Sequence, residues 1–257
     1  MKYQNDIDKM NTNRNLFLMS LPIFVELLLQ LLVGNVDQMM VSRVSQPSVA
    51  AIVNANQIMN LVIIVLSMAS TAVTVILSQY LGAQDEKNAS RTCMVSLVLI
   101  GGVSLAATIL VFAGHTPLYR AIHVPEEVFD EASLYLLIVG AFILVQGLYL
   151  TFSAMIRAFA MVKEVMIISV IMNVMNIVGN AILINGWFGM PQLGAVGAAI
   201  STDISKLVGL ALMIGMFFKS RRVKMGMSYL RPFPVQILKN LCLLAIPTGV
   251  ESFSYNL

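Results

Sequence analysis

The chain has 257 residues, of which 58% are hydrophobic and only 11% are charged, and its mean hydropathy is +0.83. Soluble domains carry about twice that share of charge, so the composition excludes a soluble domain and predicts an all-α polytopic membrane protein whose main partner is the lipid bilayer. The net charge of +3 gives no indication of a nucleic-acid partner, and the two cysteines imply no disulfide framework because both begin apolar segments.

The first apolar stretch, residues 15–41, follows a polar tail at residues 1–14 that does not resemble a signal peptide. It is long enough to cross a bilayer, yet it contains Glu26, Gln30 and Asp37, which return to one face of a helix. Ionisable groups at membrane depth usually mark a water-filled or substrate pathway. Glu26, near one end, is equally compatible with a position in the headgroup region.

Six complete spans and the start of a seventh follow from the apolar pattern. They are predicted at 15–41, 48–79, 91–113, 129–156, 164–185, 194–218 and 235–257. Turn-forming residues separate them, including Gln46-Pro47, His115-Thr116-Pro117, Pro125 and Asn185-Gly186.

Lysine and arginine are distributed unequally between the two sides that this span count creates. Thirteen of the sixteen fall on the side of the N-terminus and of the loop at 219–231. The positive-inside rule places that side in the cytoplasm. The sequence therefore predicts a multi-pass protein of the cell inner or plasma membrane with a cytoplasmic N-terminus.

The seventh span repeats part of the first. Pro22, Val25 and Glu26 correspond to Pro247, Val250 and Glu251 with one common offset of 225. Six spans between copies give both halves the same orientation, which is a parallel repeat. We expect a six-helix lobe at 15–218, a basic cytoplasmic linker at 219–234 and the start of a second lobe at 235–257, with the missing C-terminal lobe as partner.

The fifth span contains a second polar stripe. Ser169, Asn173, Asn176 and Asn180 share one helical face. Because amides in lipid need partners, this face is predicted to lie against other helices. Two interpretations stay open for the stripe, namely hydrogen bonds that hold helices together and the lining of a transport site.

The sixth span begins with the small residues of LGAVGAAIST, a pattern that permits close helix packing. Asp203 and Lys206, three positions apart, are predicted to form a structural ion pair. In the second span Asn54, Gln57 and Asn60 form a shorter polar stripe, and Gln57, with Glu26, Gln30, Asn173 and Glu251, is a candidate for lining a substrate path.

Three segments resemble the multidrug and toxic compound extrusion (MATE) family. They are Pro22 followed fifteen residues later by Asp37 in VDQMMVS, the loop SQYLGAQDEKNA at 78–89, and MNVMNIVGNAILINGWFGMPQLGAVGAAIST at 172–202. The resemblance covers the whole chain. It implies an N-terminal lobe of a two-lobe transporter that exports organic, often cationic, drugs or toxins in exchange for Na⁺ or H⁺, with no other cofactor and no enzymatic activity.

The resemblance also implies a coupling site. The first-helix Asp of the family falls on Asp37 and its fifth-helix Asn on Asn176, while Thr202 corresponds to a sixth-helix hydroxyl. In one branch a second carboxylate stands where this chain has Asn180. One carboxylate with several neutral oxygens suits a monovalent cation such as Na⁺, and the same Asp37 could instead carry a proton.

Two other classes of membrane protein are alternatives to an antiporter. A lipid-linked oligosaccharide flippase of the same wider superfamily would need cations inside the spans to meet phosphate, where the predicted spans contain Lys206 alone. An intramembrane enzyme would need a nucleophile, a metal set or an acid pair, and the sequence has no HExxH or GxSxG motif. The sequence does not identify the substrate.

Overall fold

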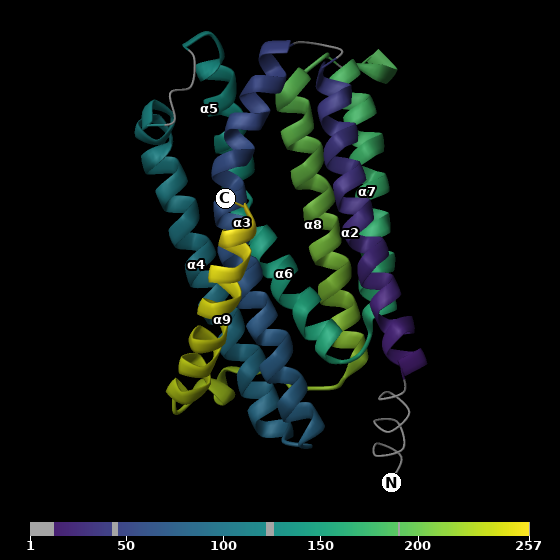
Figure 1. Cartoon of the computed structure of the whole chain (residues 1–257), viewed down its shortest axis with the longest axis vertical. Coiled ribbons are helices and arrows are strands. Elements are labelled where there is room, and N and C mark those ends of the chain that lie inside the picture. Colours follow the sequence, from purple (N-terminus) through teal and green to yellow (C-terminus); the bar gives the residue numbers. More distant parts are fainter. Residues whose placement is uncertain (1–12, 43–45, 122–125, 190, 257) are drawn as a thin grey trace.

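The computed structural model describes residues 13–42, 46–121, 126–189 and 191–256. Apart from two short 3₁₀ turns, the regular structure in these ranges is α-helical (Figure 1). The helices are α2 (Asn13–Ser42), α3 (Gln46–Gly82), α4 (Glu86–Ala121), α5 (Glu126–Ala141), α6 (Ile143–Ala158), α7 (Val162–Asn185), α8 (Gly194–Ser220) and α9 (Val235–Asn256), and the 3₁₀ turns are η1 (Trp187–Gly189) and η2 (Met227–Leu230).

The helices agree with the predicted spans in number and order. Among the described residues, five are long and apolar enough to cross a membrane, and α5 with α6 makes a sixth span if the bent pair is counted as one. In α9 the apolar part is shorter, Val235–Pro247. The prediction that His115-Thr116-Pro117 ends the third span was wrong, since α4 continues through Pro117 to Ala121.

The fourth span bends by 44° between α5 and α6. The break lies at Phe142, whose N–H bonds to Val139 O at 3.2 Å in place of a regular helical bond. Thr108 of α4 donates its hydroxyl to the carbonyl of Gly140 at 3.3 Å. A neighbouring side chain thus satisfies a backbone group beside the break, as an apolar environment requires.

Helices α7 and α8 pack closely because small residues face each other. A Cβ on Gly179 would overlap Ser201 Oγ, and one on Gly197 would lie 2.6 Å from Leu183 O. Gly209 similarly faces Met172. This is the close approach that the small residues of the sixth span predict.

The outer surface of the lobe is apolar on α7 and mixed on α3. The exposed face of α7 is formed by Ile167, Ile171, Val174, Ile177 and Val178, which suits contact with lipid. The exposed positions of α3 alternate between apolar residues and polar ones, namely Val53, Leu61, Val65 and Val75 with Gln57, Asn60, Thr71 and Ser78. The face of α3 that carries them is therefore more polar than that of α7.

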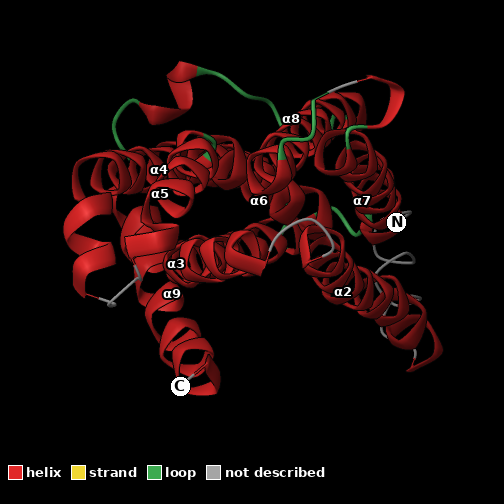
Figure 2. Cartoon of the chain, turned by 90° about the horizontal axis from the view of Figure 1, so that it is seen from above, coloured by secondary structure: helices red, strands yellow, loops and turns green. Residues whose placement is uncertain are grey.

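Seen from above, α2 lies beside α7, while α9 lies beside α3 at the opposite side of the lobe (Figure 2). The segment between α8 and α9 contains η2, and Lys224 N donates to Ser90 Oγ of α4 at 3.2 Å. The predicted linker is thus attached to the helices of the lobe at this point.

Candidate functional site

The polar stripe of α7 is the buried face of that helix. Ser169, Asn173, Asn176 and Asn180 are each at most 7% exposed, and α7 packs against α8 and α2. The helix therefore turns its amides inward and its branched apolar residues outward, the reverse of a soluble amphipathic helix. This arrangement confirms the prediction that the stripe lies against other helices.

A chain of hydrogen bonds joins the stripe to α8. Asn180 Nδ2 donates to Asn176 Oδ1 at 3.3 Å, and Asn176 Nδ2 donates to Thr202 Oγ1 at 3.0 Å. Ser201 Oγ donates to the backbone carbonyl of Asn176 at 2.9 Å. Three of the four residues that the sequence predicts for coupling, Asn176, Asn180 and Thr202, thus form one cluster of neutral oxygens and amides.

Three side chains predicted for the coupling site or the substrate path lie outside the described part of the chain. They are Asp37, predicted for coupling, and Gln30 and Glu251, predicted to line the path. Their helices are described, and α2 packs along α7. Asn173, on the same stripe, is buried, and its Nδ2 has no hydrogen-bond partner among the described residues.

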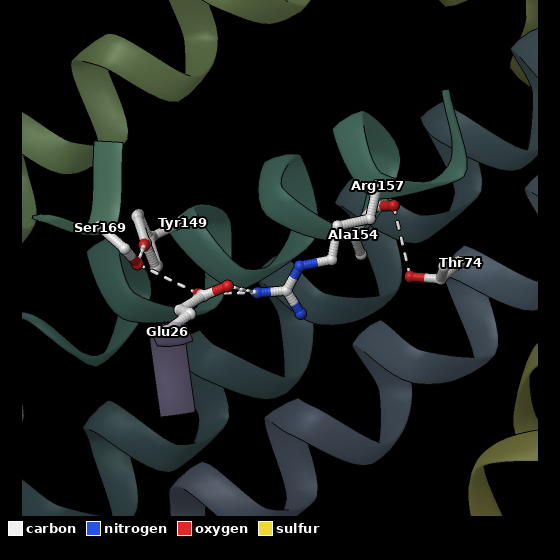
Figure 3. A network of polar contacts seen from close by, with 6 residues as sticks. All are labelled: Glu26, Thr74, Tyr149, Ala154, Arg157 and Ser169. Carbon is white, nitrogen blue, oxygen red and sulfur yellow. Dashed lines mark hydrogen bonds and ion pairs between the residues drawn. The ribbon is translucent and has the colours of Figure 1, made fainter. Parts of the chain in front are cut away.

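Glu26 forms a second polar centre, where α2, α6 and α7 meet (Figure 3). Arg157 Nη2 donates to both carboxylate oxygens, at 2.8 and 2.9 Å, and Ser169 Oγ donates to Oε1 at 3.0 Å. The hydroxyls of Ser169 and Tyr149 are 3.1 Å apart. Glu26 is only 3% exposed, so its carboxylate is enclosed by protein groups at whatever depth it occupies.

Arg157 is the functional-site residue that the sequence does not reveal. It falls in the last turn of α6, where it counts among the cytoplasmic cations. Its partner Glu26 is 131 residues away in the chain, so no spacing rule relates the two. The sequence did contain one indication of such a partner. An ionised Glu26 inside a span costs free energy unless a cation from another helix compensates its charge.

The structure gives the predicted pair of Asp203 and Lys206 no direct hydrogen bond. Both carboxylate oxygens of Asp203 are buried and lack a hydrogen-bond partner in the described part of the chain. The spacing of three residues puts the two Cα atoms on adjacent turns, and the two charges interact electrostatically. Their role as a structural ion pair stays a prediction.

Comparison with known proteins agrees with the architecture. The MatE family model matches residues 22–182. An uncharacterized transporter of Bacillus subtilis, YisQ, is 37% identical over 95% of this chain and 53% of its own length. A probable multidrug resistance protein NorM of Thermotoga maritima is 26% identical over 95% of this chain and 52% of its own length. The chain thus spans about half the length of these relatives.

A similar fold is found among solved structures. An outward-facing multidrug resistance MATE transporter of the MOP superfamily superposes with a TM-score of 0.83 at 22% identity. The match covers 92% of this chain and 52% of that transporter. The six-span lobe predicted from the sequence is therefore half of a MATE-type fold.

Proposed function

The chain belongs to the MatE family of transporters, and on that premise we propose that the protein exports small organic molecules, mainly cations, by antiport with Na⁺ or H⁺. Transport requires a site that binds the coupling ion within the membrane. The observation that carries the proposal is the buried cluster of Asn176, Asn180 and Thr202, which lies on the face of α7 that packs against α8 and α2.

Asp37 supplies the charge of the proposed coupling site. It lies on α2, eleven positions after Glu26, and eleven residues return to within about 20° of the same helical face. Glu26 contacts α7 at Ser169, which is eleven positions before Asn180. Eleven residues along α2 lead from Glu26 to Asp37, and eleven residues along α7 lead from Ser169 to Asn180. These equal separations on two packed helices support Asp37 as a neighbour of the amide cluster.

The chemistry of this cluster suits a monovalent cation. Amide and hydroxyl oxygens are hard ligands that add no net charge, so together with one carboxylate they balance Na⁺ or a proton and leave a divalent ion uncompensated. Asp37 would hold the ion or proton, while the side chains of Asn176 and Thr202 orient around it. The polar residues on the exposed face of α3, Gln57 among them, would line the substrate path.

The proposed orientation has a cytoplasmic N-terminus. The connections after α3, α6 and α8 lie at one end of the lobe (Figure 1). Basic residues stand in the helix turns that flank the first two, namely Lys87, Arg157 and Lys163, and in the segment after α8 itself, which contains Arg221 and Arg222. A cysteine at position 222, in a cysteine-free background, should react with an impermeant thiol reagent only after the membrane is opened, whereas one at position 120 should react in intact cells. The reverse pattern would contradict the orientation.

The test of coupling is efflux of a fluorescent cationic drug from vesicles under imposed Na⁺ or H⁺ gradients. Asp37→Asn keeps the size of the side chain and removes its charge, so it should abolish gradient-driven export while the protein stays inserted. Asn180→Asp adds a second carboxylate and should shift the pH dependence of export, because paired carboxylates hold one proton more tightly. Ser96→Ala, on α4, whose hydroxyl donates to Cys93 O, is the control for a polar residue outside both the cluster and the proposed substrate path. Export by Asp37→Asn at the wild-type rate under both gradients would refute this role for Asp37.

A further inference from the structure

A small polar cavity of about 100 Å³ lies between α3 and α6. Its wall contains five hydroxyl side chains and one guanidinium, and it is lined by Ser67, Ser70, Thr71, Thr74, Leu150, Ser153, Ala154 and Arg157. Hydroxyls recur at three- and four-residue spacing on α3, and Ser153 precedes Arg157 by one turn of α6. Two facing helices thus turn polar sides toward one space.

Three of the donors in this wall are unused. Ser70 Oγ, Ser153 Oγ and Arg157 Nε are buried and have no hydrogen-bond partner among the described residues. Ser70 and Ser153 are 7% and 2% exposed. Buried polar groups are ordinarily satisfied, and each group left unsatisfied costs free energy. Their presence around one cavity indicates that something with acceptor atoms occupies it.

The remaining contacts keep the cavity open and accessible. Thr74 Oγ1 donates to Ala154 O at 3.3 Å, which ties α3 to α6 at the cavity (Figure 3). Arg157 Nη2 is held by Glu26, so the guanidinium is fixed with Nε left over. Thr71 lies on the exposed polar face of α3, which gives a ligand a route in from that side.

We propose that this cavity is a binding site for an oxyanion group, a carboxylate or phosphate, held by Arg157 Nε and the hydroxyls of Ser70 and Ser153. A planar guanidinium with neutral hydroxyl donors is the usual recognition chemistry for such groups. Glu26 already neutralises Arg157, so binding is weak while Glu26 is ionised and strengthens when that charge is removed. The site goes beyond the proposed antiport, and its test measures no transport.

The experiment uses the purified protein in phosphatidylcholine nanodiscs. Its melting temperature is measured against added potassium phosphate, with potassium chloride keeping the ionic strength constant. A ligand that binds the folded state alone raises the melting temperature in a saturable way. A second arm contains no phosphate and replaces part of the lipid by phosphatidylglycerol. Stabilisation in the first arm assigns the site to a soluble oxyanion, and stabilisation in the second arm alone assigns it to a lipid headgroup.

Four variants decide whether the cavity is responsible. Ser70→Ala and Ser153→Ala should each weaken the saturable effect about tenfold, because each removes one hydrogen bond to a charged group. Glu26→Gln should strengthen it about tenfold, because the competing negative charge is lost. Ser96→Ala, a buried serine whose hydroxyl donates to Cys93 O, should bind like the wild type.

Two results would overturn the site. One is the absence of a saturable effect in both arms for both the wild type and Glu26→Gln. The other is an effect that stays undiminished in the combined Ser70→Ala and Ser153→Ala variant, which keeps the ion pair between Glu26 and Arg157. A cavity that holds only water predicts the first result, since water binding does not respond to phosphate.

Discussion

Substitutions of the two partners in the ion pair between Glu26 and Arg157 should lower the unfolding free energy by different amounts. The carboxylate side chain is 4% exposed, whereas the side chain of Arg157 is 33% exposed. Arg157→Met leaves a buried carboxylate with one hydrogen bond, from Ser169. Removing one partner of a buried pair costs about 3–5 kcal/mol. We expect a loss of unfolding free energy in that range for Arg157→Met.

Glu26→Gln should cost less, about 1–2 kcal/mol, because the remaining guanidinium is partly solvated and keeps an acceptor in the glutamine oxygen. The double variant removes both charges and should recover to within about 1 kcal/mol of the wild type, since replacing both ions of a buried pair is often neutral. The prediction is thus a strong positive coupling, at least about 3 kcal/mol, between two residues on different helices.

The measurement is a double-mutant cycle on the purified protein in mixed micelles. Unfolding is followed by loss of far-ultraviolet circular dichroism as sodium dodecyl sulfate is added. Ser169→Ala, which removes one hydrogen bond to Glu26, is the matched control and should cost about 1 kcal/mol. Equal losses in the two single variants, or a double variant equal to their sum, would refute the reasoning from burial.

Three further predictions concern single sites. Asp203 is a buried carboxylate without hydrogen bonds whose charge interacts with Lys206, so Asp203→Asn in a Lys206→Met background should raise the unfolding free energy by roughly 1–3 kcal/mol in the same assay; a loss there would contradict this. Gly147→Ala should lower the unfolding free energy by about 1–3 kcal/mol because its Cβ would overlap α4. Gly102→Ala, whose Cβ would meet no described atom within 4 Å, should be neutral or stabilising. Equal effects of the two substitutions would contradict the packing argument. The backbone N–H of Asn88 donates to the carboxylate of Asp85 at 3.0 Å, and this hydrogen bond lowers the pKa of Asp85 from its ordinary value of 3.8. Protection of the Asn88 N–H from hydrogen exchange should therefore persist above pH 3.8 and decline as the pH falls further. Protection that does not change with pH would contradict this hydrogen bond.

The helices could be predicted because their cause is local. In lipid each backbone group must bond within its own helix, so a long apolar run in the sequence is sufficient for a span. The position of the polar stripe on α7 also follows from local spacing, since Ser169 and the three asparagines share a face by helical period alone. What the stripe touches does not follow from spacing.

The failures concern contacts between distant segments. Beside the bend at Phe142, the carbonyl of Gly140 accepts a hydrogen bond from Thr108, a residue of another helix. The pairing of Glu26 with Arg157 likewise needs the fold to bring α2 against α6 and α7. Asp203 and Lys206 show the converse, because adjacency on one helix brings the two charges into electrostatic interaction without giving the carboxylate of Asp203 a hydrogen bond.

Helix α2 connects the two polar centres of the lobe, and its attachment differs from that of the other spans. Only 12% of its apolar window is buried, against 28% for the window of α4 and 39% for that of α3. Little apolar packing therefore holds α2 in place. The contacts of Glu26 with Arg157 and Ser169 become a large part of what fixes this helix.

This attachment bears on the coupling proposal through geometry. Position 37 lies eleven residues beyond Glu26 on the same rigid helix, about 16 Å along its axis at 1.5 Å per residue. A small rotation of α2 about its attachment at Glu26 moves position 37 sideways relative to α7, because displacement grows with distance from the fixed point. An ion held jointly by Asp37 and the asparagines of α7 would oppose that rotation. Binding of the coupling ion and the position of α2 would then be linked, and the strength of the Glu26–Arg157 contact would set how far the helix can move when the ion leaves.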